Sequence, residues 1–494
     1  MKFQSTRDKN AAKFSAAEVI KQGLAADGGL FVPESLPTLT ETDIKALCAM
    51  DYPERAATVL GKFLTDYTAE ELLADCRAAY AESSFVGGAA PLHKMDDTMY
   101  SLELWHGPTA AFKDMALQIM PRLLSRALVK TGEERTALIL VATSGDTGKA
   151  ALEGYKDIER IKIMVFYPVD GVSTVQKLQM QTQTGDNVNV TAIKGNFDDA
   201  QTGVKKIFGN AETAKKLDGM GYFLSSANSI NWGRLAPQIV YYVSAYCDLL
   251  TNGALQYGEP MNVTVPTGNF GNIFAAYLAK KMGLPIDKLI CASNKNHILT
   301  DFLTTGTYDR NRDFYLTMSP SMDILISSNL ERLLYFVAGP ERTAAYMKQL
   351  NENGTYTVDE DIKNAISQSF YGYFADEQQT AETIRRTMDR YHYLIDTHTA
   401  VAISAAEQYV EETGDRKPMV IASTASPYKF AADVYASLYE GTSASPLTAL
   451  DDLSAKSGTE ITYPLRGIGE RTVRFTDVVE ASEMQDAVFA YLAK

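Results

Sequence analysis

Lys113 lies in the segment WHGPTAAFKDMALQIMPRLL (105–124), where a loop is expected to lead into a helix. Phe112 and two alanines precede it, and these apolar side chains would shield its amine from water. Desolvation lowers the pKa of an amine and makes it a better nucleophile and base. Most lysines, however, are solvated surface charges, and Asp114 equally suits a helix N-terminus, so these residues alone do not single out Lys113.

A glycine-bracketed loop follows a strand-like run in PTGNFGNIFAAYLAKK (266–281) and leads into a helical pattern. Gly268 and Gly271 allow the backbone to approach a ligand closely. The start of the helix presents free N–H groups and the positive end of the helix dipole, which suits a phosphate. The loop does not match the dinucleotide pattern GxGxxG, and it lacks the lysine of a P-loop.

The loop SGDTGKA (144–150) resembles a nucleotide-binding P-loop only superficially. The pattern GxxxxGK[ST] would require glycine in place of Thr143 and serine or threonine in place of Ala150, so a P-loop NTPase is not supported. What remains is a strand, a run of small residues and a helix, whose free N–H groups are suited to hold a carboxylate.

Short buried strands alternate with helical patterns over most of the chain after the first hundred or so residues. This alternation is typical of βαβ units and a mostly parallel sheet, so the predicted fold class is α/β. Loops rich in small polar residues follow four of the strands, and open α/β sheets bind ligands at the carboxyl ends of their strands. The alternative explanation is that turns in general favour such residues. The predicted strands cover residues 137–143, 161–167, 188–193, 222–226, 262–267, 288–293 and 419–424.

Outside this alternation the patterns are mainly helical. Residues 15–37 predict a helix, a glycine-rich turn and a short extended segment, and residues 53–82 predict helix. Residues 300–390 are rich in aromatic and helix-forming residues and predict a mainly helical insertion. Residues 440–494 form a tail to which no role is assigned.

Length, charge and composition exclude several classes of protein. The chain has 494 residues and a formal net charge of −14, which predicts two or three domains and argues against nucleic-acid or anionic-membrane partners. Four scattered cysteines form no CxxC pair, five histidines form no HExxH pattern, and no metal site is predicted. The apolar runs have strand length and the start of the sequence lacks a signal-peptide pattern, so we expect a cytoplasmic protein without membrane spans.

The segment WHGPTAAFKDMALQ resembles the active-site motif HGPTxxFKDxA of the threonine synthase family, whose lysine, here Lys113, forms a Schiff base with pyridoxal phosphate. Other segments resemble family counterparts in the same order over nearly the whole chain, and the segment SPSMD resembles the longer subfamily. These segments are STR (5–7), GLAADGGLFVPE (23–34), SGDTG, NSINWGR, PTGNFGN, SPSMDILISSNLERLL (319–334), DTHTAVA (396–402) and ASTASPYKF (422–430).

The resemblance implies fold type II of the pyridoxal-phosphate enzymes, the tryptophan synthase β-like fold, as a monomer or homodimer. It implies two parallel-type α/β domains with a mainly helical insertion. The expected divisions are an N-terminal segment packed on the large domain (1–95), a small domain with Lys113 and the SGDTG loop (96–235), a large cofactor-binding domain (236–300 and 391–494) and the insertion (301–390).

The resemblance also assigns the cofactor contacts. Thr424 would face the pyridine nitrogen with a neutral hydroxyl, which does not stabilise a protonated ring as a carboxylate would. Asp146 would border the 3′-oxygen, where many relatives carry asparagine, and a carboxylate there is unfavourable unless it is protonated or turned away. The cofactor phosphate would be wrapped by Gly268, Asn269, Phe270, Gly271 and Asn272.

The substrate contacts implied by the resemblance lie in two loops. The loop containing Asp146 would receive the substrate carboxylate through Ser144, Gly145 and Thr147. The segment NSINWGR would hold the substrate phosphate through Asn228, Ser229 and Arg234, and a guanidinium suits bidentate phosphate binding. An ion pair on a helix face remains the alternative role for Arg234.

The implied activity is that of a pyridoxal-phosphate-dependent carbon–oxygen lyase of threonine biosynthesis. It converts O-phospho-L-homoserine and water to L-threonine and phosphate by γ-elimination and β-addition of water, with Lys113 transferring the protons. A related phospholyase, which releases a 2-oxo acid and ammonia, is the nearest alternative. Arg234 argues against a lyase of unphosphorylated serine or threonine, and the intact Lys113, phosphate loop and Thr424 argue against a non-catalytic relative.

Overall fold

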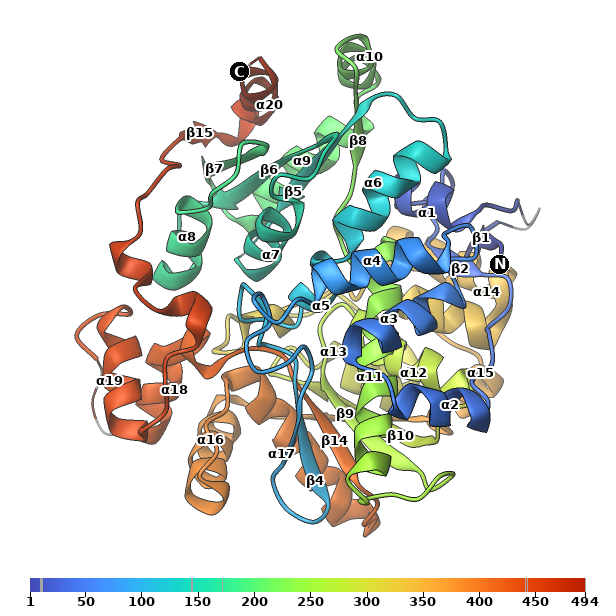
Figure 1. The fold of residues 1–494 in the computed structure, drawn as a ribbon, viewed down its shortest axis with the longest axis vertical. Helices are drawn as coiled ribbons and strands as arrows, with labels where there is room; N and C mark the ends of the chain where they lie inside the picture. Colours follow the sequence, from blue (N-terminus) through green and yellow to red (C-terminus); the bar gives the residue numbers. More distant parts are fainter. Residues whose placement is uncertain (9–11, 144, 171, 440, 442, 494) are drawn as a thin grey trace.

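Runs of β-branched and aliphatic residues form the buried strands of two sheets in this computed structural model (Figure 1). No described helix combines the length and the apolar character that crossing a membrane requires. The structure describes residues 1–8, 12–143, 145–170, 172–439, 441 and 443–493.

The smaller sheet has five parallel strands in the order β15-β7-β6-β5-β8 and lies in the upper half of Figure 1. Helices α7 and α9 pack against its strands. The strands are β5 (Thr136–Ala142), β6 (Ile161–Pro168), β7 (Val188–Lys194), β8 (Tyr222–Ser225) and β15 (Val478–Glu480). The helices between them are α7 (Asp146–Tyr155), α8 (Thr174–Gln181), α9 (Phe197–Gly209) and α10 (Ala211–Gly219).

The larger sheet has six strands in the order β13-β10-β9-β14-β4-β3, all parallel to their neighbours except the antiparallel edge strand β3. These strands are β3 (Leu92–Lys94), β4 (Met99–Glu103), β9 (Met261–Pro266), β10 (Ile286–Ser293), β13 (Phe370–Phe374) and β14 (Met419–Ser423). The helices that precede or follow its strands along the chain include α11 (Trp232–Thr251), α12 (Gly271–Lys281), α17 (Thr397–Thr413) and α18 (Ala431–Leu438). The sheet lies in the lower half of Figure 1, with α11 beside it.

The α/β class and the predicted strands are confirmed, with small shifts of their ends. The prediction that residues 53–82 are helical is confirmed, and the segment forms two helices, α3 (Tyr52–Gly61) and α4 (Ala69–Ala79). The second helix starts anew at Thr68, whose side chain accepts a hydrogen bond from the backbone N–H of Glu71 in a capping box. The sequence patterns also missed β4 and β13, which are strands of the larger sheet.

The region 300–390 is mainly helical and also carries short strands. Its strands are β11 (Thr307–Asp309) and β12 (Thr355–Thr357), which pair with each other, and β13, which pairs with β10 in the larger sheet. Its helices are α13 (Ile298–Thr305), η1 (Pro320–Met322), α14 (Leu330–Asn353), α15 (Glu360–Ser367) and α16 (Glu377–Tyr391). One edge of the larger sheet therefore comes from this region.

Both ends of the chain pack onto the body of the molecule. Near the N-terminus, Arg7 forms a bidentate ion pair with Glu331 of α14, and Thr6 donates a hydrogen bond of 2.6 Å to the same carboxylate. The tail after residue 440 contains α19 (Thr448–Ser457) and α20 (Met484–Leu492), and its strand β15 pairs with β7. The N-terminal segment contains β1 (Phe3–Ser5), α1 (Ala16–Gln22), β2 (Phe31–Pro33) and α2 (Glu41–Cys48).

Helix α7 approaches the short helix α5 (Asp114–Leu117) very closely, and α6 (Met120–Lys130) follows. A β-carbon added at Gly154 of α7 would lie 1.8 Å from the backbone carbonyl oxygen of Leu117. A glycine is therefore required at this crossing. The contact matters for the site, because α5 begins directly after Lys113 and α7 begins at Asp146.

We predict that Gly154→Ala lowers the thermal unfolding midpoint by several degrees, because its methyl group overlaps a backbone atom and overpacking costs about 1–3 kcal/mol or more. Gly209→Ala is the matched control, since a β-carbon there meets nothing within 4 Å, and its effect should stay within about 0.5 kcal/mol. Circular dichroism during heating measures both midpoints. Equal midpoints for the two variants would contradict the close crossing of α5 and α7.

Candidate active site

The amine of Lys113 lies inside the protein, and the side chain is only 12% exposed. Its Nζ lies 3.5 Å from Oδ2 of Asp146 and 3.4 Å from Oγ of Ser321. Burial lowers the pKa of Lys113, the charges of Lys429 and Arg234 act in the same direction, and Asp146 opposes them. The amine therefore gives up its proton more readily than a surface lysine would, as a nucleophile and base must.

The loop before Lys113 is held by hydrogen bonds to the residues that follow strand β14. The backbone N–H of Phe112 donates to the carbonyl of Thr424 at 2.8 Å, so Thr424 lies directly beside the lysine loop. Asp114 is fully buried and accepts hydrogen bonds from the backbone N–H and the hydroxyl of Thr109, at 2.8 and 2.6 Å. Burial raises the pKa of Asp114 to about 6. Asp114 thus organises the loop.

Asp146 is ionised, paired and almost fully buried. Its Oδ1 lies 2.8 Å from Nζ of Lys429 and accepts a hydrogen bond of 2.9 Å from the side-chain amide of Gln176, while Oδ2 faces Lys113. Burial alone would raise its pKa, but the positive charges of Lys429 and Lys113 hold the pKa of this carboxyl well below its usual range. The carboxylate is therefore held between two amines.

The turn before Asp146 accepts only glycine. Gly145 has a φ of 144°, and a β-carbon there would lie 2.4 Å from the side chain of Gln176. The backbone N–H groups of Gly145 and Gly148 both donate to the hydroxyl of Thr143, at 3.0 Å each. Thr147 is partly exposed in the first turn of α7. Ser144, which the sequence analysis assigns to substrate binding, lies outside the described residues.

The loop 268–272 forms a cradle at the start of α12. Phe270 has a left-handed φ of 65° and is buried, which turns the chain sharply into the helix. The main chain of Ser321 lies close against Gly268, where a β-carbon would be 2.7 Å from the Ser321 carbonyl oxygen. The exposed Asn269 accepts a backbone hydrogen bond of 3.0 Å from Asn329. Helix η1 and the segment after it therefore cover the cradle, and η1 also reaches Lys113 through Ser321.

Asn272 leaves a buried donor free at the start of α12. Its Oδ1 accepts hydrogen bonds from Tyr241 and Tyr242, whereas its Nδ2 is buried without a partner among the described residues. An unsatisfied buried donor costs about 1–3 kcal/mol, and the start of a helix attracts anions. A phosphate at this place would accept from Nδ2, so the residues of the cradle fit the phosphate of pyridoxal phosphate.

Arg234 provides a second buried place for an anion. It lies in the first turn of α11 and is 4% exposed, and its Nη1 donates to the carbonyl of Ala227 at 2.6 Å. Its Nε is buried without a partner in the described part of the chain, and burial lowers the pKa of Arg234 to about 10, so it stays charged at neutral pH. A buried cation without a counter-ion is costly, and a bound anion would relieve that cost.

Of the other expected site residues in the NSINWGR segment, Ser229 lies near the cradle, whereas Asn228 lies at the surface. The hydroxyl of Ser229 accepts a hydrogen bond of 3.3 Å from Asn329, whose side chain lies 3.3 Å from the position of a β-carbon on Gly271 of the cradle. Asn228 is exposed. Within the described chain, neither Asn228 nor Thr147 makes a side-chain hydrogen bond to the other expected site residues.

Several residues at the site were not assigned from the sequence. His398 accepts the backbone N–H of Ser321 at 3.1 Å, and its other ring nitrogen lies 2.7 Å from Asp396. Arg332 donates to the carbonyl of Ile230 at 2.6 Å. Most of these residues lie in the segments SPSMDILISSNLERLL, DTHTAVA and ASTASPYKF, which resemble family segments, but the resemblance gave these residues no role. Gln176 lies in no segment for which a resemblance was noted. The residues are Gln176, Ser321, Asn329, Arg332, Asp396, His398 and Lys429.

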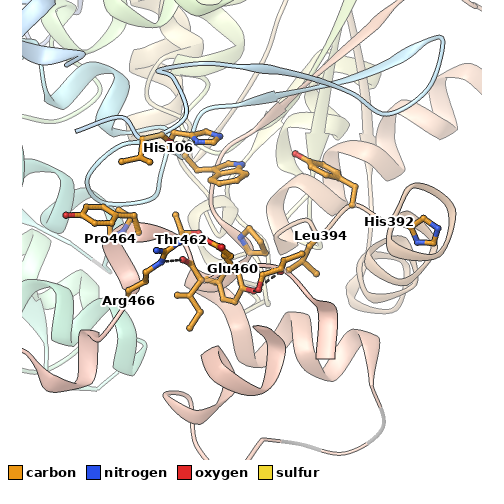
Figure 2. A pocket seen from close by; sticks show the side chains of 15 residues that line it. His106, His392, Leu394, Glu460, Thr462, Pro464 and Arg466 are labelled. Carbon is orange, nitrogen blue, oxygen red and sulfur yellow. Dashed lines mark hydrogen bonds and ion pairs between the residues drawn. The ribbon is translucent and has the colours of Figure 1, made fainter. Parts of the chain in front are cut away.

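A separate cavity of about 300 Å³ lies beside the start of the lysine loop (Figure 2). His106 lies on one side of it and Thr462 and Pro464 on the other (Figure 2), and Trp105 also lines it. Both ring nitrogens of His106 are engaged, with Glu103 at 2.6 Å and the carbonyl of Val86 at 2.8 Å. None of the residues expected to bind cofactor or substrate lines this cavity, so it is not the candidate active site.

Three family models match the chain. They are described as "Threonine synthase N terminus" (residues 2–80), "Pyridoxal-phosphate dependent enzyme" (88–425) and "Threonine synthase, C-terminal" (399–488). Threonine synthase of Pseudomonas aeruginosa is 39% identical over 87% of this chain and 89% of its own length. Human threonine synthase-like 1 is 40% identical over 87% of this chain, which spans only 58% of the human protein.

A solved structure has the same fold over the full length of both chains. The pyridoxal-phosphate-bound threonine synthase from Brucella melitensis covers 100% of this chain and is itself covered completely, with a TM-score of 0.87 and 36% identity. This agreement extends over both sheets, the region 300–390 and the two ends. The chain therefore belongs to the threonine synthase family, among the fold type II pyridoxal-phosphate-dependent enzymes.

Proposed function

We propose that this protein catalyses the threonine synthase reaction, in which O-phospho-L-homoserine and water give L-threonine and phosphate. The observation that carries the proposal is Arg234, a buried guanidinium whose Nε has no partner among the described residues and whose charge acts on Lys113. The cradle at 268–272 already offers a place for the cofactor phosphate. Arg234 is a buried cation outside that cradle whose charge acts on the reactive amine, and it therefore favours a substrate that carries its own phosphate.

The proposed cofactor contacts follow from this arrangement. Lys113 would carry pyridoxal phosphate covalently, Thr424 would face the pyridine nitrogen, and Asp146 would border the 3′-oxygen. The unpartnered Nδ2 of Asn272 supports a phosphate in the cradle. The cradle residues proposed to hold it are Gly268, Asn269, Phe270, Gly271 and Asn272.

When bound, pyridoxal phosphate withdraws electrons from the substrate and makes the proton on its amino-bearing carbon, and later a proton on the next carbon, acidic. The chain's own part is to hold and move those protons at Nζ of Lys113, whose pKa is lowered by burial. Ser144, Gly145 and Thr147 would hold the substrate carboxylate. Ser229 and Arg234 would hold the leaving phosphate, and the exposed Asn228 would join them only if the substrate reaches it.

A phospholyase that releases a 2-oxo acid and ammonia is the second candidate. Human threonine synthase-like 1, which is described as synthase-like and not as a synthase, is 40% identical over 87% of this chain, so similarity to the family does not by itself single out the synthase reaction. Both reactions need the same phosphate-binding residues and the same proton transfers, and they differ in whether water is added before release. We favour the synthase, because similarity to threonine synthases spans nearly their whole length. We also propose that the protein acts in the cytoplasm, because its four cysteines form no disulfide.

Product analysis separates the two candidates. We predict that the purified protein converts O-phospho-L-homoserine to L-threonine and phosphate in equal amounts, with little 2-oxobutanoate. Amino-acid chromatography, a phosphate assay and an assay for 2-oxo acids measure the three products. Lys113→Ala serves as the control and should form none of them. If 2-oxobutanoate and ammonia were the main products, the synthase proposal would be wrong and the phospholyase would replace it.

Loss of Arg234 should weaken substrate binding selectively. A hydrogen bond to a charged group is worth about 1.5–3 kcal/mol, so we predict that Arg234→Ala raises KM for O-phospho-L-homoserine by about tenfold or more. Cofactor occupancy, measured by visible absorbance, should change little. Arg342→Ala is the control, since that arginine is exposed and pairs with Asp361 on the surface. An unchanged KM in Arg234→Ala would remove this residue from the proposed phosphate site.

A further inference from the structure

Lys429 is a fully buried lysine to which the proposed reaction gives no role. It lies in the short helix η2 (Pro427–Phe430), which follows strand β14, and its side chain is 0% exposed. Its ammonium group lies 2.8 Å from Oδ1 of Asp146 and donates a hydrogen bond of 2.9 Å to the carbonyl of Thr109. A buried ammonium is strongly destabilising unless it is paired, so this placement needs an explanation.

The carboxylate that pairs with Lys429 also faces the reactive amine. Asp146 directs Oδ1 to Lys429 and Oδ2 to Lys113, so one anion lies between two amines. A carboxylate next to an amine favours the protonated amine, and a second cation opposes this effect. Without Lys429, the full negative charge of Asp146 would act on Lys113. The pair therefore sets how strongly the site retains the proton on Lys113.

The surroundings add few other charges. Arg234 of α11 acts on Lys113 in the same direction as Lys429. From the segment at η1, Ser321 presents a neutral hydroxyl 3.4 Å from Lys113, and His398 lies behind it, bound to the Ser321 N–H. Asp114 faces Thr109. Among the described residues, Asp146 is thus the carboxylate that pairs with Lys113, and Lys429 is the other cation that pairs with Asp146.

We propose that Lys429 is a positioning residue that acts through Asp146: it keeps the carboxylate ionised and fixed, and thereby limits its pull on the proton of Lys113. The pairing also explains how a carboxylate is accommodated at a position where many fold type II relatives carry asparagine, because the Lys429–Asp146 pair is neutral as a whole. The inference rests on the proposed attachment of the cofactor at Lys113, but not on which product is released.

The test uses the cofactor-loaded enzyme without substrate and follows its visible absorbance from about pH 5 to 10, where a lysine-bound pyridoxal phosphate reports the protonation of its nitrogen. Removing a neighbouring cation should raise that pKa. We predict that Lys429→Met moves the absorbance curve to higher pH by about one unit or more. Lys429→Arg keeps the charge and should leave the curve near that of the wild type.

The variant Asp146→Asn provides a second test of the same charge balance, which is needed if Lys429→Met fails to fold. It removes the anion and leaves the cation, so its curve should move to lower pH. The double variant Asp146→Asn/Lys429→Met removes both charges and should return towards the wild-type curve. A merely structural lysine would lower the unfolding midpoint without moving any curve. The inference would be overturned if the absorbance curves of both single variants coincided with that of the wild type. If Lys429→Met does not fold, a curve of Asp146→Asn that coincides with the wild-type curve would overturn it. Neither result depends on which product the enzyme makes.

Discussion

The site depends on the burial of one carboxylate between two amines. Asp146, Lys113 and Lys429 come from three segments far apart in the sequence, and each is shielded from water. Charges that lose their hydration must find partners, so the fold has to bring these segments to within hydrogen-bonding distance of one another. The close crossing at Gly154 brings α7 onto α5, and the bond between Phe112 and Thr424 ties the lysine loop to the end of β14.

The same segments connect the reactive amine to the two places for anions. Ser321 contacts Lys113 and lies against Gly268 of the cradle, and Asn329 reaches from the cradle to Ser229. Helix α14 follows, and its Glu331 binds Arg7 near the N-terminus. The N-terminal STR signature is therefore explained by an ion pair that fixes the helix behind the site. The cavity of Figure 2 lies outside this set of contacts.

The sequence predicted the parts that depend on local patterns. Buried runs located most strands of both sheets, though not β4 and β13, because strand burial leaves a clear local signal. Glycine spacing located the cradle, where the main chain of Ser321 lies close against Gly268. Lys113 was identified only through the resemblance, since a burying environment is not visible from its neighbours. Lys429 and Gln176 received no role, because their partner Asp146 is more than twenty residues away in the chain and only the folded structure brings them together. The helical pattern over 53–82 did not by itself show the division into two helices, which the capping box at Thr68 marks.

The central claim is that Lys113 is the residue that binds the aldehyde of the cofactor. Reduction of the pyridoxal-phosphate-loaded protein with borohydride fixes the cofactor to its lysine, and peptide mass spectrometry then locates it. The account predicts one modified peptide, with the added mass on Lys113 and none on the buried Lys149 or Lys429. A cofactor fixed at another lysine, with Lys113 unmodified, would contradict the account.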